Sequence, residues 1–252
     1  GARDGTARLW DLKERRQVAV LKDHKSRVFA VAFSPSGDLL ATGGRDKMVR
    51  LWRVPSGKPA GVLSGHTGSV VGVAISRDGS RLVSTSSSGR LRIWALPGGK
   101  PEPTIENVPR DIARLAFIRG GRWILAAAGS DLYVFDTETR KEVHRLEGHT
   151  SEIFRLEVTE DERYAITSGR DDQVILWDLK TLRSVQRLQF DTLPLGVTIR
   201  DDHQGFAVCT GVPIQFFPLS LDLWRQDPKA LLERSQKRAG LKLQRFRLVT
   251  PR

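Results

Sequence analysis

Three histidines have the spacing best suited to chemistry. His24, His66 and His149 each lie 28 residues before a tryptophan, and hydroxyl-bearing residues and aspartates follow each of them in the intervening segment. A histidine, a carboxylate and a hydroxyl are the side chains of a hydrolase catalytic triad. The spaced histidines recur three times, however, whereas an active site is needed only once. We therefore expect these residues to brace the fold rather than to catalyse a reaction.

The rest of the sequence contains no catalytic or metal-binding motif. HExxH, CxxC, Walker A and GxSxG patterns are all absent. His144 and His203 have no second ligand at metal spacing, and the glycine pairs at 43–44 and 98–99 do not join a strand to a helix as a phosphate loop does. We predict that the chain is not an enzyme, with no catalytic residue, no cofactor, no metal and no small-molecule substrate.

An aromatic residue closes each unit of an internal repeat. The units end, at intervals of 42, 42, 41, 42 and 40 residues, at Trp10, Trp52, Trp94, Phe135, Trp177 and Phe217. A period of about 40–45 residues is that of a four-stranded propeller blade. Turn residues divide residues 28–66 into four short strands: a strand followed by a turn within 28–38, and further strands at 39–44, 47–54 and 58–66. A β-sandwich, the alternative architecture, has no reason to repeat at this interval.

The repeat and the histidines in phase with it resemble the WD-repeat family. The histidines stand in a DH pair at 23–24 and in GH pairs at 65–66 and 148–149. The resemblance covers about residues 1–219 and implies an all-β fold, a WD40 β-propeller of about five full blades plus a partial N-terminal blade. We expect a ring of seven blades, with six as the alternative. Residues 1–24 offer two strands and no starting Met, so we expect one blade and part of another to lie upstream.

The resemblance also implies a polar tetrad in each regular blade, in which a histidine, a hydroxyl residue, a turn aspartate and a tryptophan are linked in series. The tetrad residues are His24, Thr42, Asp46 and Trp52; His149, Thr167, Asp171 and Trp177; and, without an aspartate, His66, Ser84 and Trp94. Ser88 stands at the missing aspartate's position, and the units ending at Phe135 and Phe217 have no tetrad. The chemistry is reasonable, because a buried Trp N–H needs an acceptor and an aspartate fixes the histidine tautomer.

Partners of WD propellers commonly dock on the face whose loops lead into the innermost strands. By resemblance, its exposed positions lie three and five residues after the histidine and just before the turn aspartate. The candidate partner-binding residues are Arg3, Arg27, Phe29, Arg45, Val71, Phe154 and Arg170. Arginine and aromatic residues are favoured at binding hot spots. The alternative is that Phe29 and Phe154 fill space between blades while the arginines only face water.

The formal net charge of +12 favours an acidic partner. We expect a scaffold or recognition module that binds an acidic or phosphorylated protein. Nucleic acid, bound by the basic surface and the C-terminal tail, is the alternative, although an aromatic stacking array is missing. A solvated basic surface is the plainer reading of the charge. No stretch approaches the about 18 apolar residues of a membrane span, and the single Cys209 fits a reducing compartment, so we predict a cytoplasmic protein.

Residues 221–252 depart from the repeat and are predicted to form a basic helix–strand tail after the blades of 1–220. Asp227 and Pro228 are suited to start a helix and Gly240 to stop it, while 241–249 alternates like a strand. The tail resembles the segment after the WD repeats of some large bacterial proteins, including kinase-linked ones. A cap over the last blade's edge is the favoured role, and a basic interaction tail is the alternative.

Overall fold

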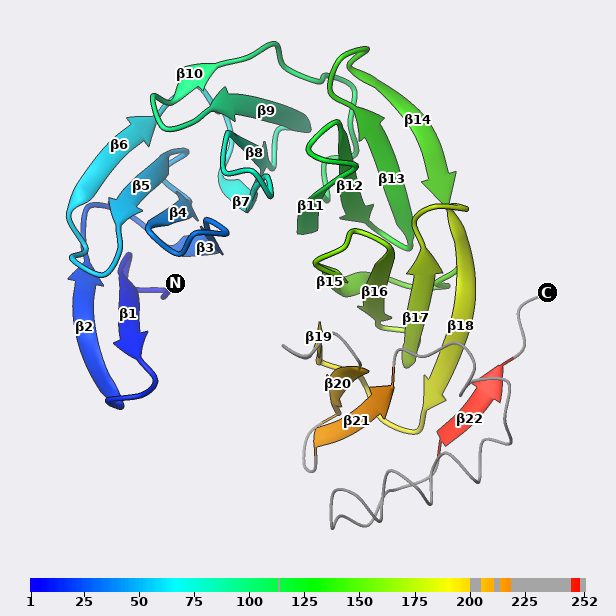
Figure 1. Ribbon diagram of the computed structural model, residues 1–252. Helices are drawn as coiled ribbons and strands as arrows, with labels where there is room; N and C mark the ends of the chain where they lie inside the picture. The colour runs from blue at the N-terminus through cyan, green and yellow to red at the C-terminus, as the bar shows by residue number, and fades with distance from the viewer. Residues whose placement is uncertain (113, 200–204, 211–213, 219–245, 250–252) are drawn as a thin grey trace. The chain divides into compact units, whose positions relative to one another are not determined.

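The computed structural model describes residues 1–112, 114–199, 205–210, 214–218 and 246–249. These residues form antiparallel β-sheets, and none of them lies in a helix (Figure 1). Three of the six sheets formed by these residues consist of four strands that are consecutive in the sequence, and a fourth sheet adds a fifth strand to four such strands. Four consecutive antiparallel strands are the architecture of a propeller blade. The all-β repeat fold predicted from the sequence is confirmed.

The chain divides into two compact units, of which the first comprises Gly1–Ala128 and Leu132–Arg145. It begins with a two-stranded sheet of β1 (Ala7–Asp11) and β2 (Arg16–Leu21). Three four-stranded sheets follow. They are formed by β3 (Val28–Phe33), β4 (Leu39–Gly44), β5 (Val49–Arg53) and β6 (Pro59–Leu63); by β7 (Val70–Ile75), β8 (Arg81–Ser86), β9 (Arg90–Ala95) and β10 (Lys100–Pro101); and by β11 (Arg114–Ile118), β12 (Trp123–Ala128), β13 (Asp131–Asp136) and β14 (Lys141–Leu146).

The second unit comprises Gly129–Asp131 and Leu146–Arg252. Its larger sheet contains β15 (Ile153–Val158), β16 (Tyr164–Gly169), β17 (Gln173–Asp178) and β18 (Arg183–Phe190), and a smaller one contains β19 (Gly196–Ile199), β20 (Gly205–Cys209) and β21 (Ile214–Pro218). The strand β22 (Phe246–Val249) pairs with the outer edge of β18, from Arg187 opposite Val249 to Phe190 opposite Phe246 (Figure 1). The predicted C-terminal strand therefore exists over these four residues, whereas the predicted helix lies outside the described residues.

Adjacent sheets of the first unit pack through small and branched side chains. The innermost strand β7 lies against β3 and β4, with Val70 and Val73 joining Ala41 and Leu51 in one buried cluster. A Cβ atom at Gly43 would lie 2.6 Å from Val70, so the glycine is needed for this close approach. Buried strands of this kind hold the loops at their ends in fixed positions.

The turn between the second and third strand of a blade requires a left-handed residue. Lys47, Gly89 and Asp172 occupy that position in three sheets, with φ angles of 68°, 75° and 59°. Each directly follows the position of the predicted tetrad aspartate. The turn therefore folds that position back toward the histidine that precedes the sheet.

Candidate functional site

In the β3–β6 sheet, four side chains are hydrogen-bonded in series. Nε1 of Trp52 donates to Oγ1 of Thr42 over 2.9 Å, and this hydroxyl lies 2.8 Å from Nε2 of His24. Nδ1 of His24 lies 2.9 Å from Oδ1 of Asp46. Since a carboxylate can only accept, Nδ1 carries the proton and Nε2 accepts from the threonine. His24, Thr42 and Trp52 are buried, so the series braces the blade interior.

The β15–β18 sheet repeats this arrangement. Nε1 of Trp177 donates to Thr167 over 2.9 Å, the threonine hydroxyl lies 2.8 Å from Nε2 of His149, and Nδ1 of His149 lies 2.9 Å from Asp171. The backbone N–H of Thr150 also donates to Asp171, over 2.8 Å. The two braces thus match atom for atom at these contacts.

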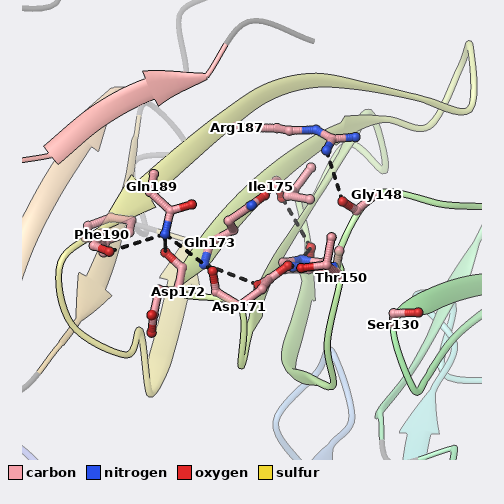
Figure 2. A network of polar contacts seen from close by, with 12 residues as sticks. Ser130, Gly148, Thr150, Asp171, Asp172, Gln173, Ile175, Arg187, Gln189 and Phe190 are labelled. Carbon is pink, nitrogen blue, oxygen red and sulfur yellow. Dashed lines mark hydrogen bonds and ion pairs between the residues drawn. The ribbon is translucent and has the colours of Figure 1, made fainter. Parts of the chain in front are cut away.

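Figure 2 shows further polar contacts around the Asp171 turn. The side-chain amide of Gln189 donates to the carbonyl oxygens of Asp171, Asp172 and Phe190, each over 3.3 Å. Arg187 on the same strand donates to the carbonyl of Gly148 over 3.0 Å. The outer strand β18 therefore holds both the turn and the histidine loop.

The β7–β10 sheet completes its brace with a different residue. Trp94 donates to Ser84 over 2.9 Å, and the Ser84 hydroxyl lies 2.7 Å from Nε2 of His66. Nδ1 of His66 meets the hydroxyl of Ser86 at 3.0 Å, and Ser88, at the aspartate position, contacts only Ser86 within this network, at 2.8 Å. The prediction from the sequence placed Ser88 at the aspartate position, but the residue that contacts His66 is Ser86.

The type of residue that stands two positions before the aspartate position explains this exchange. Gly44 and Gly169 stand there in the other two braces, and a Cβ atom would lie 2.5 Å from Nδ1 of the histidine in each case. The same Cβ would lie 2.7 Å from the carboxylate oxygen of Asp46 and 2.6 Å from that of Asp171. Glycine and aspartate therefore occur together, and Ser86 occurs with Ser88. This pairing across repeats is the sequence signal that identifies Ser86.

The braces differ in charge. Burial opposes ionisation of Asp46 and Asp171, but hydrogen bonds and charge interactions with His24 and His149 outweigh it and lower the pKa of both carboxyl groups. Burial, followed by the positive charge of Arg92, lowers the pKa of His66 to about 4. The β7–β10 brace therefore contains a neutral histidine and no carboxylate.

The candidate partner-binding positions in the first unit are joined through the backbone. The N–H of Arg45 donates to the carbonyl of Arg27 over 2.8 Å, and the N–H of Val28 donates to the carbonyl of Ala2 over 3.1 Å. The loops that carry Arg3, Arg27 and Arg45 are thus adjacent. Arg3, Arg45 and Phe29 are exposed, Phe29 to 47 %, while Arg27 and Val71 are half-buried.

In the second unit the equivalent backbone bond joins Arg170 to Glu152, over 2.8 Å. The two side chains also form an exposed ion pair of 3.9 Å, so the charge of Arg170 is partly compensated. Phe154 is half-buried. Arg170 therefore differs from Arg27 and Arg45, which pair with no carboxylate among the described residues.

Other polar side chains of the described part do not form a metal centre. No group of three His, Cys, Asp or Glu residues there could hold a metal ion. His144 instead packs on Trp123, with ring centroids 5.7 Å apart, and the guanidinium of Arg119 lies 3.6 Å from the Trp123 ring centre. Cys209 is half-buried and is not part of a disulfide bond among the described residues. Within the described residues, no helix is long and apolar enough to cross a membrane.

Comparison with known proteins identifies the repeat. Residues 15–53, 57–95 and 140–178 match the family model described as "WD domain, G-beta repeat". Over 66 residues the chain is 36% identical to THO complex subunit 6 of Homo sapiens and 36% identical to TBC1 domain family member 31 of Bos taurus. The aligned segment is 26% of this chain but only 19% and 6% of those proteins, so the chain spans a small part of each relative's length.

Proposed function

Because this chain carries three WD40 repeats, which mediate protein–protein interaction and generally act without catalysis, we propose that it is a scaffold or recognition module. Its partner is an acidic or phosphorylated protein segment, bound through the arginine-bearing loops. The repeats supply rigid sheets, and the loops at their ends supply the recognition groups.

The adjacency of the loops of Arg27 and Arg45 carries this proposal. The 2.8 Å backbone bond fixes the two residues beside each other, and the loop of Arg3 is attached through Val28 and Ala2. Within the described residues, none of the three guanidinium groups is in an ion pair. Free guanidinium groups make bidentate hydrogen bonds to carboxylates and phosphates. Phe29 adds an exposed apolar anchor close to Arg27.

A peptide screen tests the proposal. Acidic, phosphorylated, neutral and basic peptides are tested for binding to the wild-type protein. The same peptides are tested for binding to the double variant Arg27→Glu, Arg45→Glu. We expect acidic and phosphorylated peptides to bind the wild type and not to bind the variant. The control, Lys13→Glu with Lys100→Glu, changes two exposed lysines elsewhere in the same unit by the same total charge and should bind normally. Equal binding by the two double variants would overturn the proposal.

Nucleic acid is the second candidate, because the net charge of +12 attracts any polyanion. Affinity that merely falls with added salt would reflect this charge alone. Discrimination between nucleic-acid sequences, together with no peptide preference, would favour this candidate. A bacterial origin, a link to a kinase domain and a cytoplasmic location also remain proposals, supported by the tail resemblance and the single cysteine.

A further inference from the structure

The carboxylate of Asp46 uses its two oxygens differently. Oδ1 lies 2.9 Å from Nδ1 of His24 and accepts the backbone N–H of Met48 over 3.3 Å. Oδ2 accepts the backbone N–H of Lys25 over 3.2 Å and pairs with Arg50 at 3.5 Å. In the β15–β18 sheet, Oδ2 of Asp171 likewise accepts the N–H that follows the histidine, from Thr150. For Asp46, Oδ1 thus serves the brace, and Oδ2 satisfies a loop amide and an arginine. Both oxygens of Asp171 lie near Nδ1 of His149, at 2.9 and 3.0 Å.

In the β7–β10 sheet only the first of these oxygens is replaced. The Ser86 hydroxyl takes the place of Oδ1 at Nδ1 of His66. Thr67 stands where Lys25 and Thr150 stand, directly after the histidine. Arg92 stands where Arg50 stands, since Arg92 is opposite Ser84 in the strand register as Arg50 is opposite Thr42. Among the described residues, no acceptor takes the place of Oδ2.

The donors that Oδ2 would satisfy therefore lack an acceptor. Among the described residues, no hydrogen bond of the Thr67 N–H and no ion pair of Arg92 is found, whereas the Lys25 N–H and Arg50 both contact Oδ2 of Asp46. Nε is buried without a partner in both Arg92 and Arg50. Thr67 and Ser87 are exposed and Ser88 is half-buried, so the position can be reached from solvent. The nearby His66 is uncharged above a pH of about 4, because burial and then the charge of Arg92 lower its pKa to that value.

We infer that the β7–β10 sheet holds a binding site for a phosphate group, with one phosphate oxygen at the position that corresponds to Oδ2 of Asp46. Arg92 provides the charge, and the Thr67 N–H and the Ser88 hydroxyl donate hydrogen bonds. Backbone amides and an arginine are the usual donors to phosphate. The inference deepens the proposed function, on which it rests for a phosphorylated partner, and it adds a site formed by residues other than the Arg27–Arg45 loops.

Amide chemical shifts of the ¹⁵N-labelled chain provide the test. The protein is titrated with inorganic phosphate and, separately, with a phosphoserine peptide, each against sodium chloride of matched ionic strength. Saturable shifts of the Thr67 and Ser88 amides are expected with both phosphate compounds and not with chloride. Tighter binding of the peptide would identify a phosphorylated side chain as the ligand, and equal binding would identify the free ion.

Three variants make the test specific. Arg92→Gln should weaken phosphate binding by about tenfold or more. Arg50→Gln is the matched control, because Asp46 already pairs with Arg50, and should leave the phosphate affinity unchanged. The double variant Ser86→Gly, Ser88→Asp places a carboxylate in the site without crowding residue 86 and should abolish phosphate binding, which keeps the test open if Arg92→Gln fails to fold.

The outcomes separate the two proposals. Equal phosphate affinity in the wild type and Arg92→Gln, or no saturable shift at Thr67, would overturn this inference. A phosphopeptide that shifts only the loops of Arg27 and Arg45 would also overturn it, while leaving the proposed function intact. Phosphate binding at Thr67 without binding of any acidic or phosphorylated peptide would support the site and contradict the proposed function.

Discussion

The hydroxyl of Ser86 lies 3.0 Å from Nδ1 of His66, where two other sheets of this protein place a carboxylate. The exchange costs the β7–β10 sheet the charge on its brace but keeps the histidine hydrogen-bonded at both ring nitrogens. Buried polar groups are almost always satisfied in this way. Because one brace contains a serine where the other two contain a carboxylate, substitutions can test how much each brace contributes to the free energy of unfolding.

A double-mutant cycle on Ser86 and Ser88 tests the explanation of the exchange. Ser88→Asp alone brings a carboxylate against the Ser86 side chain, as the 2.7 Å approach at Gly44 indicates. Adding Ser86→Gly should relieve the contact and let the new aspartate accept from His66. We expect a favourable coupling of about 1–3 kcal/mol in urea unfolding. Additive effects of the two substitutions would show that glycine and aspartate are not linked.

Removing the tryptophan donor tests the brace of the second unit. Trp177→Phe should lower the free energy of unfolding by about 1–3 kcal/mol, because the Thr167 hydroxyl loses its Nε1 donor in a buried site. Phe135→Trp is the control and should give no comparable gain, since its sheet has no histidine partner. A neutral Trp177→Phe in urea titration would show that the series does not stabilise the blade.

The pH dependence of stability should report on His66. Burial, followed by the positive charge of Arg92, lowers its folded-state pKa to about 4 from the ordinary histidine value of 6.5. The unfolded state therefore takes up the proton first as the pH falls. The contribution of neutral His66 is present in full above pH 6.5 and declines until about pH 4, by about 2–3 kcal/mol. Asp46 and Asp171 have lowered pKa values and lose their contribution only below their unfolded value of 3.8.

Urea titrations of the wild type and His66→Gln at pH 7, 6, 5 and 4.5 separate these groups. The wild type should lose stability steadily across this range, whereas His66→Gln should lose much less of it. An identical pH slope in both proteins would mean that His66 titrates normally and is not buried as described.

The N-terminal sheet should promote self-association. Trp10 is 59 % exposed, whereas the equivalent Trp52 is 2 % exposed, and β1 pairs with β2 alone among the described residues. On β3, Val31 is 47 % exposed, whereas the equivalent Val73 on β7 is 8 % exposed. Free strand edges and apolar patches favour association. Trp10→Ser with Val31→Thr should lower the self-association seen by sedimentation; an unchanged monomer fraction would contradict this.

Much of the fold was predictable because the repeat is local. The tryptophans and histidines return at a constant spacing, and each repeat forms one sheet from consecutive strands, so the strand order follows from the sequence. The pairing of β22 with β18 was not predictable in the same way. It joins residues about sixty positions apart through backbone hydrogen bonds, which depend little on side-chain identity.

The candidate sites were predictable only in part. The positions of Arg27 and Arg45 followed from the repeat, but the bond that joins them is a backbone contact with no signature of its own. Ser86 was missed because the difference between a Gly–Asp pair and the Ser86–Ser88 pair gains its meaning only from the distance in space to His66. The sequence does not distinguish Arg92 from other arginines, because its role follows from the ion pair that its counterpart Arg50 forms with Asp46.

A charge-swap experiment tests the central claim, recognition of an acidic partner by Arg27 and Arg45, most directly. Two peptides are used: an acidic peptide selected for binding to the wild type, and the same peptide with its acidic residues changed to lysine. Calorimetry measures the binding of each peptide to the wild type and to the double variant Arg27→Glu, Arg45→Glu. The account predicts that the variant loses the acidic peptide and gains the lysine peptide. A correctly folded variant that still binds the acidic peptide with wild-type affinity would contradict it.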